Sequence, residues 1–204
     1  MAEIRPNVDL SYLVKDSGIL LQDFYSEIET ATDFEDLVDK IEAAMETDAY
    51  LGVTRGGTST NFEMETRIVE YDGRRVRSVG DFVVDSSTPQ IETTLLVQSD
   101  TNLQRIFPMC DTTIDTATGA FSLRPRMGTP LPEDYMEDLC LIKPLTNGDI
   151  QIIALFRAIN TASVTMTGAD KSESEVAVTF TGNARDFKDM KYAPVDIMTW
   201  KRTP

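Results

Sequence analysis

Histidine is absent from this 204-residue chain, which also has only two cysteines and one tryptophan. Without histidine, the chain cannot build a Ser-His-Asp or Cys-His catalytic arrangement. Two cysteines cannot supply a common zinc site unless carboxylates complete the ligand set. The Arg55-Gly56-Gly57 run lacks the spacing of the common nucleotide-binding loops. We therefore expect no enzyme, no metal and no cofactor; the 34 acidic residues leave chance carboxylate pairs, but no pattern singles one out.

Basic residues are also scarce, because 19 Lys and Arg stand against 34 Asp and Glu, for a net charge of −15. Nucleic-acid-binding proteins gain affinity from Lys and Arg, so we do not expect direct binding of DNA or RNA. Acidic walls would instead keep DNA from sticking inside a channel. Solubility alone explains the acidity equally well.

Long hydrophobic runs are missing as well. No segment approaches the roughly 18 apolar residues of a membrane-spanning helix, and the N-terminus lacks the apolar core of a signal peptide. We expect a protein that is made in a cytoplasm and does not insert into membranes. In that reducing compartment Cys110 and Cys140 are expected to be free, buried thiols rather than a disulfide.

A long alternating segment follows Gly56-Gly57, which we interpret as a turn. Apolar and charged side chains alternate over residues 62–71, as is typical of a β-strand, and the strand closes on the tight-turn signal Asp72-Gly73. One face of this predicted strand carries Phe62, Met64 and Ile68, and the other carries Glu63, Glu65 and Arg67.

Arg74, Arg75 and Arg77, just after this turn, are the only strongly basic spot of the chain. Without interleaved aromatic residues they are a weak nucleic-acid footprint. A contact between subunits fits them better, because arginine binds carboxylates in a bidentate manner. A solvated turn is the alternative, since exposed ion pairs contribute little stability.

The rest of the chain predicts helices and antiparallel strands. Apolar residues at helical spacing predict an amphipathic helix over 32–47, with Thr32 or Asp33 as its N-cap. Asn147-Gly148 between two apolar runs predicts a hairpin. We also expect a short helix at 99–107 and strands at 82–84, 91–97, 139–143, 150–157, 163–167 and 175–181.

These elements predict a mainly β fold: an antiparallel β-sandwich or partly open barrel with a flanking α-helix. We expect one domain over 1–204, with an N-terminal arm and helix (1–48), an irregular loop or insertion (109–137) and an extended C-terminal tail (184–204) that could dock on a neighbour. Prolines exclude a central strand at 124–132. Unpaired sheet edges could pair around a closed ring of identical subunits.

The order of several segments resembles that of the major tail tube proteins of long-tailed bacteriophages. The likeness is carried by the LGVTRGG run at 51–57, the charged strand that closes on Asp72-Gly73, the TLLVQSDTNLQRIFP run at 94–108, and residues 178–186 with 193–197. The proline-rich stretch at 124–132 matches no part of that pattern.

The resemblance implies a structural virion protein that self-assembles into stacked hexameric rings, contacts other tail proteins and lets DNA pass without specific binding. It would reside in the host cytoplasm before assembly and in the virion tail afterwards. Such a protein would have no catalytic residues and no cofactor. Alternatives are a β-sandwich binding or adhesion module, for instance for carbohydrate, or another tail component such as a tail terminator. The candidate lumen or interface residues are Glu63, Glu65 and Arg67, and the candidate inter-ring contacts are Tyr71, Asp72, Arg74, Arg75 and Arg77.

Overall fold

The computed structural model describes residues 18–52, 54–69, 80–96, 100–145, 148–165, 175–185 and 191–202. Its architecture is mainly β, with antiparallel strands and a few helices, which confirms the predicted fold class. In chain order the elements are β1 (Ile19–Gln22), α1 (Tyr25–Thr30), α2 (Phe34–Met45), β2 (Thr54–Ile68), β3 (Phe82–Leu96), α3 (Asp100–Ile106), β4 (Cys110–Ile114), β5 (Phe121–Pro125), a 3-10 helix (Pro132–Asp134), β6 (Met136–Pro144), β7 (Ile150–Asn160), β8 (Glu175–Thr181) and β9 (Val195–Trp200).

Strand β7 joins two halves of the sheet. The first half contains β1, β6 and β9, and the second half contains β8, β3 and β2. Within the described residues the strand order is β1-β6-β7-β8-β3-β2, with β9 also on β7, and all of these pairs are antiparallel. β7 pairs with β9 up to Leu155 and with β8 from Ile159. Arg157, between these points, has a left-handed φ of 45°. The strand therefore changes partners at an unusual backbone conformation.

The first hydrophobic cluster lies between the two halves of the sheet. Leu139 and Leu141 of β6 pack there with Phe180 of β8 and Ile91 of β3. Because side chains alternate along a strand, the intervening residues of β3 and β8 face the opposite side of the sheet. Burial of the inner face by both halves makes the fold a sandwich.

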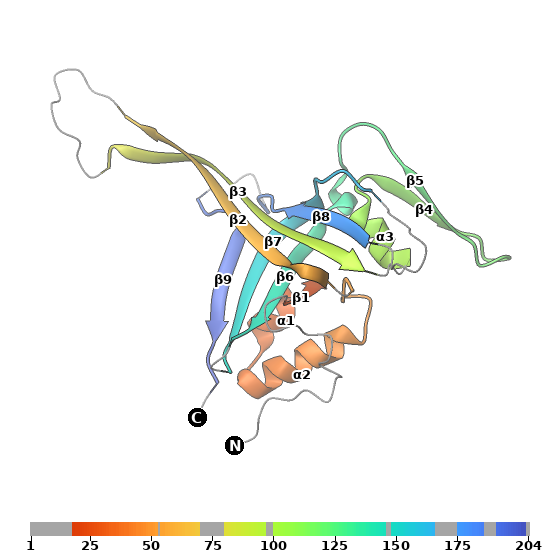
Figure 1. Cartoon of the computed structure of the whole chain (residues 1–204), viewed down its shortest axis with the longest axis horizontal. Coiled ribbons are helices and arrows are strands. Elements are labelled where there is room, and N and C mark those ends of the chain that lie inside the picture. The colour runs from red at the N-terminus through yellow and green to blue at the C-terminus, as the bar shows by residue number, and fades with distance from the viewer. Residues whose placement is uncertain are drawn as a thin grey trace.

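The second cluster lies between the first half of the sheet and helices α1 and α2, which cover it in Figure 1. Cys140 and Ile142 of β6 point into it, so this strand is buried on both faces. The predicted helix is confirmed as α2, and the Asp33 side chain caps it by accepting a hydrogen bond from the Asp36 N–H at 2.9 Å. α2 buries Phe34, Leu37 and Ile41 against the sheet.

Two sequence-based expectations about β2 and β3 are wrong. Gly56-Gly57 is not a turn between elements but an irregularity inside β2, where the pairing skips from Arg55 to Thr58. Both glycines have positive φ, which only glycine adopts readily. Residues 82–84 and 91–97 were expected as separate strands, yet β3 runs unbroken through Pro89. Proline, which lacks a backbone N–H, is tolerated there because the bond at this position uses its carbonyl oxygen. That oxygen accepts a hydrogen bond from the Gly182 N–H at 3.0 Å.

Other expectations fail in the second half of the chain. The stretch 109–137 is not wholly irregular, because β4 and β5 form a separate two-stranded hairpin that projects from the body in Figure 1. Residues 163–165 form no strand, and β8 pairs with β3 and β7 instead. The C-terminal segment is not an extended tail, since β9 pairs with β7 of its own chain.

The hairpin and the short helix are confirmed. β6 and β7 pair along most of their length, and the Leu145 N–H donates to the Asp149 carbonyl oxygen at 2.8 Å across the predicted turn. The helix expected at 99–107 is α3. Cys110 and Cys140 are both free thiols, the first half-buried and the second buried. No helix among the described residues is both long and apolar enough to cross a bilayer.

Candidate functional site

An exposed polar surface covers the outer side of β2, β3 and β8, and we call it the polar face. Apart from the register shift that leaves Asp85 as an extra residue beside Ser86, its residues alternate with the core residues of the same strands, so they point away from the first cluster. Glu92 lies opposite Ser59 on one side and opposite Thr179 on the other. The polar face comprises Arg55, Ser59, Asn61, Glu63, Glu65 and Arg67 of β2, Asp85, Ser86, Thr88, Gln90, Glu92 and Thr94 of β3, and Glu175, Ala177, Thr179 and Thr181 of β8.

The three candidate lumen residues of β2 all lie on the polar face. Glu63 and Glu65 are exposed, and the Ser86 hydroxyl donates to Glu65 Oε2 at 3.0 Å. Arg67 Nε donates to Asp85 Oδ1 at 2.8 Å. The sequence therefore placed these three side chains on one surface correctly, although their role as a lumen stays a prediction.

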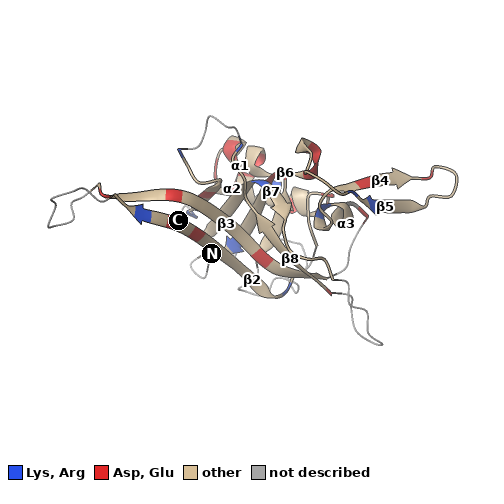
Figure 2. Ribbon diagram, turned by 90° about the horizontal axis from the view of Figure 1, so that it is seen from above, with Lys and Arg blue, Asp and Glu red and all other residues tan. Residues whose placement is uncertain are grey.

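Both arginines of the polar face contact an acidic side chain on another strand. Arg55 of β2 reaches across β3 to Glu175 of β8, and Arg67 pairs with Asp85 of β3. The remaining charges on this face are carboxylates, namely Glu63, Glu65 and Glu92. Figure 2 shows the charged residues along β2 and β3. Such a surface presents little positive charge to a polyanion.

Beyond the body, β2 and β3 continue as a two-stranded projection, which we call the arm (residues 62–69 and 80–89). Figure 1 shows it extending from the side opposite the β4–β5 hairpin. Pairing of β3 with β8 stops at Gln90, so no third described strand supports the arm. Isolated two-stranded hairpins are marginally stable in water. The arm is thus the part of the sheet that its own chain supports least.

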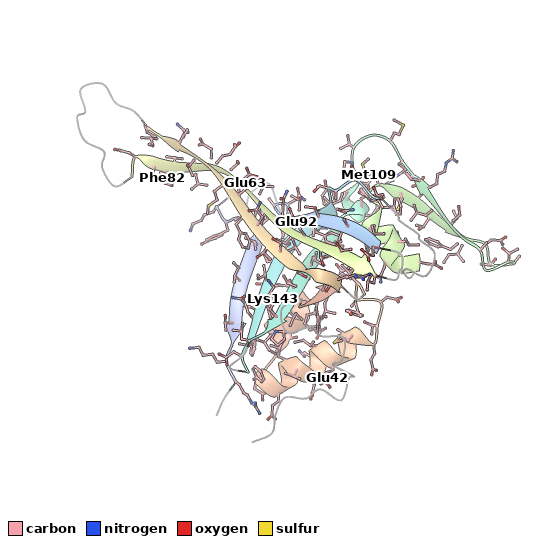
Figure 3. The ribbon with its side chains drawn as sticks, in the orientation of Figure 1. Glu42, Glu63, Phe82, Glu92, Met109 and Lys143 are labelled. Atoms are coloured by element: carbon pink, nitrogen blue, oxygen red, sulfur yellow. The ribbon has the colours of Figure 1, made fainter. Side chains whose placement is uncertain are left out.

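One side of the arm carries an apolar stripe. It is the side on which Phe62, at the base of the arm, packs against the first hydrophobic cluster. The Phe82 side chain, labelled in Figure 3, is 64% exposed and Met64 is 59% exposed. Val84 and Ile68 are also exposed, and the register places Ile68 opposite Phe82. Contiguous apolar surface of this kind usually marks an interaction site. Sequence reasoning took Met64 and Ile68 as one face of a strand but missed that nothing in the described chain covers them.

In the part of the sheet made by β2, β3 and β8, two edges also lack a described partner strand. β2 is the last strand of the order, and it is 15 residues long. β8 meets β7 only at Phe180 and Thr181, so the side of residues 175–178 away from β3 has no described strand. Unpaired edges of this length are a template for pairing with another chain.

The candidate inter-ring residues cannot be placed. Tyr71, Asp72, Arg74, Arg75 and Arg77 lie outside the described residues, in the 70–79 segment that connects the strands of the arm in sequence. Their contact role stays a prediction.

A buried carboxylate holds the start of α1 against the sheet. Asp138 of β6 accepts hydrogen bonds from the N–H groups of Phe24 at 2.8 Å and Tyr25 at 3.0 Å. Burial raises the pKa of Asp138 above its ordinary value of 3.8, although those hydrogen bonds pull in the opposite direction. Burial also raises the pKa of the neighbouring Cys140 thiol well above 9.0. Both groups have core positions, and we assign them a structural role.

Comparison with known proteins adds little beyond the geometry. No protein-family model matches the chain, and no curated protein matches it. A solved structure entitled "Crystal structure of Hcp protein" is similar with a TM-score of 0.23 and 12% sequence identity. The similarity covers 59% of this chain and 62% of that one, so the chain spans less than two thirds of that protein's length.

Proposed function

We propose that this chain is a structural subunit that self-assembles into stacked hexameric rings, forming a tail tube like that of long-tailed bacteriophages. The observation that carries the proposal is the arm, which exposes Met64, Ile68, Phe82 and Val84 without cover from the described chain. A hydrophobic stripe on an unsupported hairpin gains stability when a second copy covers it. The segment order at 51–108 and 178–197, which resembles that of tail tube proteins, supports the same conclusion.

The two uncovered edges support a ring rather than an open dimer. In each copy, β2 and residues 175–178 of β8 lie at opposite edges of the three strands β8, β3 and β2. The β2 edge of one copy can therefore pair with residues 175–178 of the next copy. Pairing these edges makes a head-to-tail contact that uses a different surface on each partner, and such contacts form a ring where the rotation between copies closes. A continuous sheet around the ring would place every polar face on the same side of the wall.

We further propose that the polar face lines the lumen. Its two arginines are paired with Glu175 and Asp85, and its other charges are acidic. DNA that passes along this surface would meet carboxylates and hydroxyls rather than unpaired cations, so it would slide without being bound. In this proposal the protein needs neither catalytic residues nor a cofactor, and it resides in the virion tail after assembly in the host cytoplasm.

The test is the size of the purified protein as a function of concentration. Static light scattering should show growth from monomers to large species, and negative-stain electron microscopy should show rings or hollow tubes with a regular axial repeat. A protein that stays monomeric at high concentration, also when a tail-tip nucleus is added, would instead be a β-sandwich binding module. That result would refute the proposed tube.

A further inference from the structure

A cavity of about 270 Å³ opens at the corner where β7 leaves β9. Its walls include Tyr25 of α1, Phe156 of β7, Arg185, Tyr192 and Asp196 of β9. Backbone hydrogen bonds fix these walls, because the Phe156 N–H donates to the Pro194 carbonyl oxygen at 3.0 Å and the Phe156 carbonyl oxygen accepts from the Asn183 N–H at 2.8 Å. The cavity therefore belongs to the folded body and not to the arm.

Arg185 is stacked on the aromatic wall of this cavity. Its guanidinium carbon lies 3.7 Å from the centre of the Phe156 ring and 5.1 Å from that of Tyr25. The two rings meet edge to face at 5.0 Å. Stacking covers the flat faces of a guanidinium but leaves its in-plane N–H groups open for bidentate bonds. Stacking thus holds Arg185 in place, and no group of the described residues accepts a hydrogen bond from its side chain.

No described carboxylate forms an ion pair with Arg185. The acidic residue of the cavity, Asp196, instead accepts a hydrogen bond from the Tyr25 hydroxyl at 2.8 Å. Burial and this bond raise the pKa of Tyr25 from 10.0 to about 12, so at neutral pH the hydroxyl keeps its proton and continues to donate. Asp196 is therefore engaged with Tyr25, and within the described part of the chain no carboxylate occupies the donors of Arg185.

A second cation, Lys191, lies over the ring of Tyr192, which is one wall of the cavity. The Lys191 ammonium is 5.1 Å from the centre of the Tyr192 ring, and that ring is 66% exposed. Two stacked cations beside exposed aromatic surface are unusual on a chain with a net charge of −15. Arg185 is thus opposite in sign to most of the charged side chains of the same protein.

We propose that the Arg185 cavity receives an Asp or Glu side chain from a second copy of this chain. Charge complementarity selects this occupant: each copy carries 34 acidic residues against 19 basic ones, so an approaching copy presents carboxylates far more often than any other charged group. Arg185 would bind the carboxylate through two parallel hydrogen bonds. The inference rests on the proposed self-assembly, and it adds a contact that is separate from the arm and the sheet edges.

Sedimentation velocity of the full-length protein tests this contact. Arg185→Gln keeps the length of the side chain but removes its charge, and it should weaken self-association by about tenfold or more, as expected for a charged hydrogen-bonded pair. Arg124→Gln, which removes one positive charge from the exposed strand β5, is the matched control and should leave self-association within about twofold. Equal effects of both variants would overturn the proposal, because they would reflect net charge alone.

Asp196→Asn tests whether Arg185 binds a carboxylate of a second copy or acts through Asp196 of its own chain. If Arg185 serves a second copy, this variant removes a repulsive charge and self-association becomes equal or tighter. If Arg185 instead acts through Asp196, Asp196→Asn weakens self-association as much as Arg185→Gln does, and the proposal fails. The unfolding midpoint of each variant, measured in parallel, shows whether a loss of self-association is merely a loss of fold.

A titration with a small carboxylate tests the proposed carboxylate site separately from the proposed tube. Acetate added to dilute, isotopically labelled protein should shift the Arg185 Nε–H signal in a nuclear magnetic resonance spectrum, and the Arg185→Gln spectrum identifies that signal. A shift without any self-association of the wild type would leave a carboxylate site but refute the second copy as its occupant. Tubes that form normally from Arg185→Gln would refute the inference while the proposed function stands.

Discussion

Phe62 of β2 and Pro89 of β3 lie directly opposite each other, and this pair marks the point where the sheet leaves the body. Phe62 packs against the first hydrophobic cluster, and the Pro89 carbonyl oxygen still accepts a hydrogen bond from Gly182. One residue further into the body, Gln90 pairs with β8, whereas the strands beyond Phe62 and Pro89 pair only with each other. Everything distal to this pair is arm, and its apolar stripe needs cover from outside the described chain.

The first prediction concerns that stripe. Replacing Met64 and Phe82 together with Ser should reduce self-assembly strongly, because it removes the largest exposed apolar side chains of the arm. Stability of the monomer should change by less than about 0.5 kcal/mol, since surface substitutions have small effects. Light scattering measures assembly and urea unfolding measures stability. Ile114→Ser, at a position that is 68% exposed on β4, is the matched control and should assemble normally.

The second prediction concerns the polar face. Asp85→Asn removes the carboxylate that pairs with Arg67 and should raise affinity for double-stranded DNA, by roughly twofold to tenfold at low salt. Fluorescence anisotropy with a labelled duplex measures it. Asp39→Asn, on the exposed side of α2, removes the same charge elsewhere and should have no such effect. If both variants bind DNA alike, the local pairing of Arg67 does not matter.

The third prediction concerns the pH dependence of stability. Because burial raises the pKa of Asp138 above 3.8 in the folded state, protonated Asp138 favours folding, and this contribution is lost as pH rises from 3.8 through the raised pKa. Asp138→Asn does not titrate, so the wild type should lose stability relative to it over that interval. Urea unfolding at a series of pH values measures the difference. A constant difference across the interval would contradict the raised pKa.

The fourth prediction concerns the packing of the C-terminal strand. A Cβ atom at Gly182 would lie 2.8 Å from the Pro194 carbonyl oxygen, just before β9 begins. Gly182→Ala should therefore lower the free energy of unfolding by about 1–3 kcal/mol, the usual cost of overpacking. Chemical denaturation tests this. Unchanged stability would mean that the segment before β9 does not pack on β3 and β8 as described.

Local chemistry makes much of this fold predictable. The helical spacing of Phe34, Leu37 and Ile41 identifies α2 together with its cap, and the Asn147-Gly148 signal identifies the β6–β7 hairpin. The alternation of side chains along residues 62–71 is enough to put Glu63, Glu65 and Arg67 on one surface. These features depend on residues that are close in sequence.

Non-local pairing escapes the same reasoning. Pro89 predicts a strand break, because the sequence cannot show that a neighbouring strand uses only its carbonyl oxygen. The C-terminal segment resembles a free tail, because its pairing with β7 joins residues far apart in sequence. Arg185 and Tyr25 do not stand out at all: no motif connects them, and only the fold brings the guanidinium over the ring.

Electron cryo-microscopy of the concentrated wild-type protein is the sharpest test of the proposed tube. We expect rings of six copies stacked into a hollow tube, with β2 and β8 of neighbouring copies paired and Glu63, Glu65 and Arg67 facing the lumen. Compact monomers at every concentration, even with a tail-tip nucleus present, would contradict it. A tube whose lumen is lined by α1 and α2 would contradict the proposed orientation of the polar face.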